Sequence, residues 1–198
     1  MEEDADANLM LVGVMPDAAA AWDALYAKVK AGASAVMLLP ETLLKGVKDP
    51  FDYEVHVPER LPFENKGKLT FVQNWHYHTY GAVKAHPFTK GLQKGLMDDD
   101  YYMQATPQFV FFEQDVPEEI AALSIGQPYY TTSTEGTAGY LFGTTLSTYR
   151  LGEGRLTLNC FKLFDQYGDS PNHQNLRENP AADRLLLNII THEAGIAK

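Results

Sequence analysis

The first forty residues contain two short apolar runs, one on each side of a helical repeat. Leu9–Val14 is almost wholly apolar, which is typical of a strand buried on both faces of a parallel sheet. From Trp22 to Val29, apolar side chains recur at i, i+3, i+4 and i+7, and this spacing predicts one apolar face of a helix. Ala35–Leu39 is the second apolar run. The order predicts a βαβ unit, which is right-handed in nearly all known cases.

The middle of the chain is less regular. Prolines and mixed charge interrupt residues 40–67, which we expect to be mainly loop after one short helical turn. Apolar runs at 69–73, 108–113 and 121–125 predict further strands. We expect loops to fill most of the segment between the first two of these strands.

Two β-rich runs near the C-terminus predict a hairpin. Tyr140–Arg150 and Arg155–Lys162 are joined by a short turn that contains two glycines. A period of two places Leu156, Leu158 and Cys160 on the same face of the second strand. We therefore expect Cys160 to be buried.

An amphipathic helix is predicted to close the chain. Asn179 is a favourable N-cap, and Pro180 suits the first helical turn. Leucine and isoleucine residues between 182 and 190 then form one apolar face that includes Leu186 and Ile189. With the parallel unit first, the hairpin late and this helix last, the pattern predicts an α/β protein.

Composition and charge narrow the class of protein. The formal net charge is −10, and four acidic residues lie within the first six, which leaves about −6 for the rest of the chain. This balance argues against nucleic-acid binding, which needs a basic face. We expect residues 1–7 to be a disordered acidic leader, unlike a signal peptide, and residues 8–198 to form a single domain.

Two further classes are also excluded by composition. No run of about 18 apolar residues is present, so we expect a soluble chain without a membrane span or a membrane partner. Cys160 is the only cysteine, which excludes an internal disulfide, a zinc cluster of thiolates and a CxxC redox pair.

Three segments resemble a known family of domains. They are Ala21–Leu39, the His-Pro-x-Thr-x-Gly-Leu segment His86–Leu92, and the hairpin Tyr149–Cys160 with the helix that follows it. Together they resemble the class I glutamine-amidotransferase-like domain, which is flavodoxin-like, and the related ThuA-like domains. More narrowly, they resemble the versions appended to glycoside hydrolases of the family 2, β-galactosidase type.

The resemblance implies a fold. It is a flavodoxin-like three-layer sandwich with a mostly parallel sheet, a C-terminal antiparallel hairpin and a closing helix. A complete domain of this kind begins with a strand, a helix and a strand ahead of the unit at 9–39, and here only a short acidic segment precedes it. Either that first βαβ half lies on another segment, or this is a minimal version of the fold.

The chain departs from the amidotransferase pattern at the nucleophile. True amidotransferases carry a cysteine in a Gly-x-Cys-x-Gly elbow, and the sequence contains no such elbow. Cys160 lies within a predicted strand between Asn159 and Phe161, where a thiol packs as a small apolar group. We therefore expect no thiol-dependent amidotransfer.

Histidines in the middle of the chain are candidate metal ligands. His76 and His78 would point to one face of a strand, and His86 with the run Asp98–Asp100 could complete a site of nitrogen and oxygen ligands. The alternative, which we favour, is that these residues belong to a polar surface or interface loop, with no metal and no cofactor.

Aromatic residues gather in the same region. Their rings suit stacking on sugars, contact with another protein or plain core packing. Carboxylates such as Glu113 and Glu119 show no arrangement typical of acid–base catalysis. The candidate substrate or interface residues are Trp75, Tyr77, Tyr80, Tyr101 and Tyr102.

These features lead to a functional hypothesis by analogy. The chain is interpreted as a non-catalytic accessory domain of a carbohydrate-active enzyme, whose hydrolytic carboxylates would lie elsewhere. Its expected partners are the catalytic domain, a second chain or another copy of itself, because a shortened βαβ sheet exposes an unpaired edge. The alternatives are a ThuA-like metal-assisted sugar hydrolase or isomerase and a stand-alone sugar-binding module.

Overall fold

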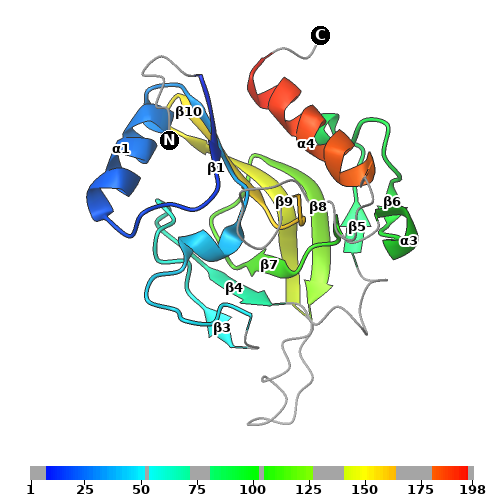
Figure 1. The fold of residues 1–198 in the computed structure, drawn as a ribbon, viewed down its shortest axis with the longest axis horizontal. Helices are drawn as coiled ribbons and strands as arrows, with labels where there is room; N and C mark the ends of the chain where they lie inside the picture. The colour runs from blue at the N-terminus through cyan, green and yellow to red at the C-terminus, as the bar shows by residue number, and fades with distance from the viewer. Residues whose placement is uncertain are drawn as a thin grey trace.

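The computed structural model gives the chain one mixed sheet with helices on both sides (Figure 1). The structure describes residues 8–51, 54–71, 81–102, 105–126, 141–163 and 180–195. The predicted acidic leader, residues 1–7, lies outside these ranges. The elements in chain order are β1 (Leu9–Val12), α1 (Ala19–Lys30), β2 (Ser34–Met37), η1 (Pro40–Leu43), β3 (Val55–His56), β4 (Lys68–Phe71), β5 (Gly81–Val83), η3 (Pro87–Thr89), β6 (Gly95–Leu96), α3 (Asp99–Tyr102), β7 (Phe109–Phe112), β8 (Glu119–Gly126), β9 (Leu141–Leu151), β10 (Gly154–Asn159) and α4 (Pro180–Glu193).

The predicted βαβ unit is confirmed. β1 and β2 pair in parallel, with Leu9 opposite Ser34, and α1 buries the four apolar residues of its predicted face. β10 lies on the other side of β2, also in parallel. Gly154, at the start of β10, allows the hairpin to approach α1 closely, because a Cβ there would lie 2.1 Å from the carbonyl oxygens of Val29 and Ala33.

The predicted mostly parallel, flavodoxin-like sandwich is wrong. The described part of the chain contains nine strand pairings, of which only β1–β2 and β2–β10 are parallel. β9 is the central strand and pairs with β10, β8 and β7, all antiparallel. The reason is that the described residues from β3 to β8 form mainly strands, with only the short η3 and α3 among them, whereas parallel pairing needs a crossover connection, usually a full helix.

Each side of the sheet has its own hydrophobic core. Successive residues of β2 alternate between the two cores, with Val36 on the α4 side and Ala35 and Met37 on the α1 side. Leu156 and Leu158 face the α1 side together with Cys160, which is buried as predicted. Burial raises the pKa of the Cys160 thiol well above its ordinary value, so it packs as an apolar group.

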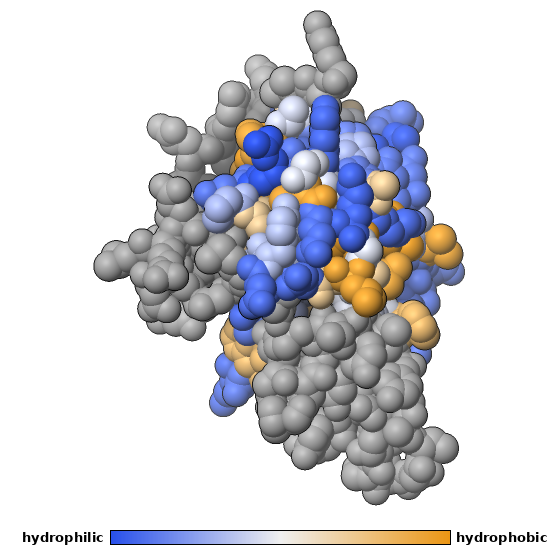
Figure 2. Space-filling model, turned by 90° about the vertical axis from the view of Figure 1, so that its right-hand side faces the viewer, coloured by the Kyte–Doolittle hydropathy of each residue, from blue (hydrophilic) through white to orange (hydrophobic). Residues whose placement is uncertain are grey.

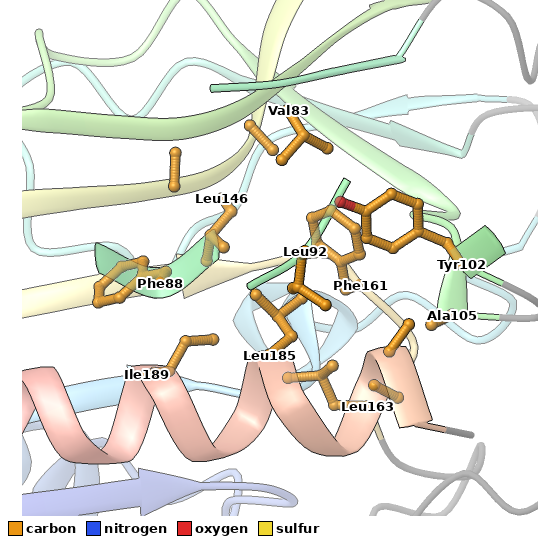
Figure 3. Packing of buried hydrophobic residues seen from close by; sticks show 14 of the residues in the cluster. Val83, Phe88, Leu92, Tyr102, Ala105, Leu146, Phe161, Leu163, Leu185 and Ile189 are labelled. Atoms are coloured by element: carbon orange, nitrogen blue, oxygen red, sulfur yellow. The ribbon is translucent and has the colours of Figure 1, made fainter. Parts of the chain in front are cut away.

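The closing helix is also confirmed, although Asn179 lies outside the described residues. Figure 3 shows Leu185 and Ile189 pointing from α4 into the core that contains Phe88 and Leu146. Leu185 and Ile189 are fully buried, whereas Leu186 only packs against the border of this core. The Asn188 side-chain amide donates to the carbonyl oxygens of Phe88 and Lys90, both at 2.8 Å, and so fastens α4 to η3.

Candidate functional site

The structure describes only some of the predicted site residues. Tyr101 is exposed, whereas Tyr102 is buried in the α4-side core and its hydroxyl donates to the carbonyl oxygen of Gln93 at 2.5 Å. Burial, with a smaller contribution from Tyr101, raises the pKa of Tyr102 to about 12. Tyr102 is therefore a core residue. The candidates that lie outside the described ranges are Trp75, His76, Tyr77, His78 and Tyr80.

His86 belongs to a cluster of ionisable side chains between the sheet and α4. Its Nε2 atom lies 2.8 Å from Oε2 of Glu119 on β8. The same carboxylate oxygen lies 3.1 Å from Arg155 on β10, whose Nε is 3.3 Å from Glu193 at the end of α4. The cluster therefore joins η3, β8, β10 and α4. The cluster brings together residues that are distant in the chain: His86 and Glu193 are 107 positions apart.

Hydrogen bonding fixes the proton on His86. Nδ1 accepts from the backbone N–H of Phe88 at 3.2 Å, so the ring carries its hydrogen on Nε2 and donates it to Glu119. Burial lowers the pKa of His86, although the hydrogen bond with Glu119 opposes this effect. The lowered pKa favours the neutral imidazole, and both ring nitrogens take part in hydrogen bonds within the protein.

Glu119 and Glu193 are the two carboxylates of the cluster, and both are held by neighbouring side chains. Burial would raise the pKa of Glu119, but the hydrogen bond from His86 and the positive charge of Arg155 outweigh it, and the pKa is lowered. The side chain of Glu193 is fully buried, and it also accepts from Thr157 at 3.1 Å. A buried carboxylate needs such partners, because removing it from water without them is costly. The cluster is best described as an electrostatic clamp between α4 and the sheet.

Only part of the candidate metal site lies within the described residues. Within those ranges, no group of three or more His, Cys, Asp or Glu side chains could hold a metal ion. His86 contacts Glu119 rather than Asp98–Asp100. In that run, Asp98 instead accepts from the backbone N–H of Asp100 at 2.9 Å, next to α3.

A groove lies on the opposite side of the sheet, between α1 and residues 59–62. Its volume is about 600 Å³, and it is lined by α1 from Ala19 to Lys30, by Asp17 and Lys45, and by the segment Glu59–Pro62. No site was predicted here from the sequence, because isolated charged residues are typical of any solvated surface. For Glu193 a pattern was present: it continues the apolar face of α4, four residues after Ile189.

The edge of the sheet is the third candidate surface. Among the described residues β1 pairs only with β2, so its other side is unpaired. Leu11 in β1 is 44% exposed and Val14, just after it, is 66% exposed. By contrast, hydrophilic residues cover most of the described surface on the side seen in Figure 2, although hydrophobic residues gather in one area of it.

Comparison with known proteins leaves the family open. No family model matches the chain, and no curated protein matches it. Among solved structures, a cold-adapted beta-galactosidase from Rahnella sp. R3 is similar at 10% identity with a TM-score of 0.38. The match covers 93% of this chain and 21% of that one, so the chain spans about a fifth of that protein. A TM-score of this size does not establish a shared fold, and the resemblance to amidotransferase-like domains stays a prediction.

No helix in the described ranges is long and apolar enough to cross a bilayer.

Proposed function

We propose that this chain is a non-catalytic assembly domain of a carbohydrate-active enzyme, and that it associates with a second copy of itself through β1. The observation that carries the proposal is the outer edge of β1, which pairs with no strand among the described residues. An exposed edge with apolar, uncharged side chains favours pairing with another strand unless charge, proline or a covering segment blocks it. Leu9–Val12 contains neither a charged residue nor a proline.

The hydrogen bonds of β1 define which backbone groups point outward. The carbonyl oxygens of Asn8 and Val12 accept from Ser34 and Leu38 at 2.8 Å, so residues 8, 10 and 12 face β2. The N–H and C=O groups of Leu9 and Leu11 therefore point away from the sheet. These are the groups that an added strand would pair with.

The spacing of these groups suits a two-fold axis. In an antiparallel pair centred on Met10, Leu9 of one copy would lie opposite Leu11 of the other, and each such pair would exchange two hydrogen bonds. The arrangement is self-complementary, since the same strand supplies both sides. It would also cover the exposed side chain of Leu11 with an apolar neighbour.

The link to carbohydrate enzymes depends on the sequence resemblance. The segments that carry it form most of α1 with β2, η3 with the residues after it, and the end of β9 with β10 and α4. The hydrogen bonding of His86 supports a structural rather than a catalytic role for the His-Pro-x-Thr-x-Gly-Leu segment. The parent activity implied by the resemblance is hydrolysis of a glycosidic bond by a partner domain.

Sedimentation equilibrium tests the assembly role. We expect the purified chain to be a dimer at micromolar concentration and Leu11→Lys to be a folded monomer, because Lys is a common protection of edge strands. Leu187→Lys is the matched control, since Leu187 is 55% exposed on α4. A wild-type monomer, or a Leu11→Lys dimer, would overturn the assembly proposal.

Enzyme assays test the non-catalytic role. The isolated chain should hydrolyse none of a panel of chromogenic glycosides, with or without added divalent metal. Hydrolysis by the chain alone would refute the proposal. One equivalent of tightly held transition metal that is lost from the double variant His76→Ala and His78→Ala would favour the metal-assisted sugar hydrolase instead.

A further inference from the structure

The groove beside α1 has the properties of a ligand site. Its volume of about 600 Å³ is within the range of known small-molecule pockets, which is about 300–1,000 Å³. It lies on the α1 side of the sheet, away from the clamp on the α4 side (Figure 1). The groove does not include the outward groups of β1, so its function is independent of the edge.

Several residues that line the groove contact one another. Trp22 and Tyr26 lie one turn apart on α1 with ring centroids 5.9 Å apart, and both are buried. The Arg60 guanidinium lies over the Trp22 ring, 5.3 Å from its centroid, and is held by the Thr42 carbonyl oxygen and by Asp17. The Tyr26 hydroxyl donates to the carbonyl oxygen of Arg60 at 2.6 Å. We expect these contacts to hold the lining residues in place, which lowers the entropy cost of binding.

The charges around the groove balance. Three acidic and three basic side chains line it, namely Asp17, Asp23, Glu59, Lys30, Lys45 and Arg60. Arg60 pairs with Asp17, and Lys66 lies 3.6 Å from Glu59. Among the described residues, the side chains of Asp23, Lys30 and Lys45 form no hydrogen bond or ion pair, so one acceptor and two donors line the groove unpaired.

We propose that this groove binds a neutral sugar. Each sugar hydroxyl can both donate and accept a hydrogen bond, so a single ligand can satisfy the Asp23 carboxylate and the Lys45 ammonium group together. Arg60 has five donors, of which the contacts with Thr42 and Asp17 use two. An apolar face of the sugar would pack against Pro62, which is only partly buried.

Other ligand classes fit the groove less well. An anionic ligand would be repelled by the carboxylates of the groove, and a cationic ligand would be repelled by its basic side chains. An apolar ligand would remove six charged side chains from water without replacing their hydrogen bonds. A zwitterion such as an amino acid could match both signs and is the competing outcome.

Nuclear magnetic resonance of the Trp22 indole N–H tests the proposal. The chain has two tryptophans, so Trp75→Phe leaves a single indole signal, which comes from the groove. We expect saturable shifts of this signal with glucose, galactose, lactose or maltose. Glucuronate and glucosamine, which carry a charge, should bind at least about tenfold more weakly than the neutral sugars.

Matched variants separate the groove from the rest of the surface. The double variant Asp23→Ala and Lys45→Ala should weaken sugar binding at least tenfold without changing the melting temperature. Lys94→Ala with Asp100→Ala removes the same two charges near β6 and α3 and should leave binding unchanged. Repeating the titration on Leu11→Lys keeps this result separate from the assembly proposal.

Three outcomes would overturn the proposal. They are the absence of shifts with every neutral sugar, tighter binding of charged sugars or of glycine, and unchanged binding in the Asp23→Ala and Lys45→Ala variant.

Discussion

Charged residues gather on both sides of the sheet, but the two sides use them differently. On the α4 side, His86, Glu119, Arg155 and Glu193 pair with one another, and the Glu193 side chain is fully buried. On the α1 side, charged side chains stand around a groove of about 600 Å³. Ionisable residues therefore do not by themselves indicate a functional site. What distinguishes the α1 side is that its charged groups are still accessible to a ligand.

The two sides also differ in how their helices are attached. α4 is fastened by a buried core, by the clamp and by the side-chain amide of Asn188. α1 is fastened by its apolar face and by contacts with Arg60, which themselves form part of the groove. We infer that the α4 side supplies stability and that the α1 side and β1 supply binding. The following predictions test this division.

The largest effect should come from the α4-side core. Ile189→Ala removes a fully buried side chain and should cost about 2–5 kcal/mol of unfolding free energy. Leu187→Ala on the exposed face of the same helix should cost less than about 0.5 kcal/mol. Urea denaturation measures both values. A small loss for Ile189→Ala would mean that α4 does not hold the fold together.

The next effect should come from the clamp. Glu193→Gln keeps the shape of the side chain but removes the charge that faces Arg155, so it should cost about 1–3 kcal/mol. Glu118→Gln is the matched control, because its pair with Arg150 at 3.3 Å lies on the surface and should contribute at most about 0.5 kcal/mol. If the two variants lose the same unfolding free energy, the burial of the clamp does not increase its contribution to stability.

The smallest effect should be a dependence of stability on pH. The pKa of His86 is lowered in the folded state, so the unfolded chain binds more protons as the pH falls below about 6.5. Stability should therefore be complete above about pH 6.5 and decline below it. The lowered pKa of Glu119 adds a further loss at more acidic pH, as that carboxylate becomes protonated in the folded protein.

His86→Asn isolates this effect. Asn can still accept the Phe88 N–H, as a good N-cap residue does, but it does not titrate. As the pH is lowered from 8 to 5, the midpoint of urea unfolding should fall for the wild type and should change less for the variant. The same pH dependence in both proteins would assign the titration to other groups.

The sequence predicted the long, strongly periodic elements. β1–α1–β2, the β9–β10 hairpin and α4 are each defined by residues close together in the chain, so their apolar periods were sufficient. The fold class was wrong because one parallel unit was taken to represent the whole sheet. β5 and β6 have only three and two residues, too few to show a period, and their pairings are set by tertiary contacts.

The candidate site was predicted less well than the fold. His86 was identified as a candidate, but its partner Glu119 lies 33 residues away, and Arg155 and Glu193 were not considered. Such pairs are created by the sheet and cannot be found from spacing. The groove was missed for the same reason, since Trp22 and Arg60 meet only when α1 packs against residues 59–62.

Amide hydrogen exchange in β1 tests the proposed assembly role most directly. Met10 and Val12 face β2, so their amides should be protected at every protein concentration. The amides of Leu9 and Leu11 should be protected at high concentration and should lose this protection on dilution, as the two copies separate. If Leu9 and Leu11 exchange rapidly at all concentrations, β1 is not the assembly surface, and the central claim is wrong.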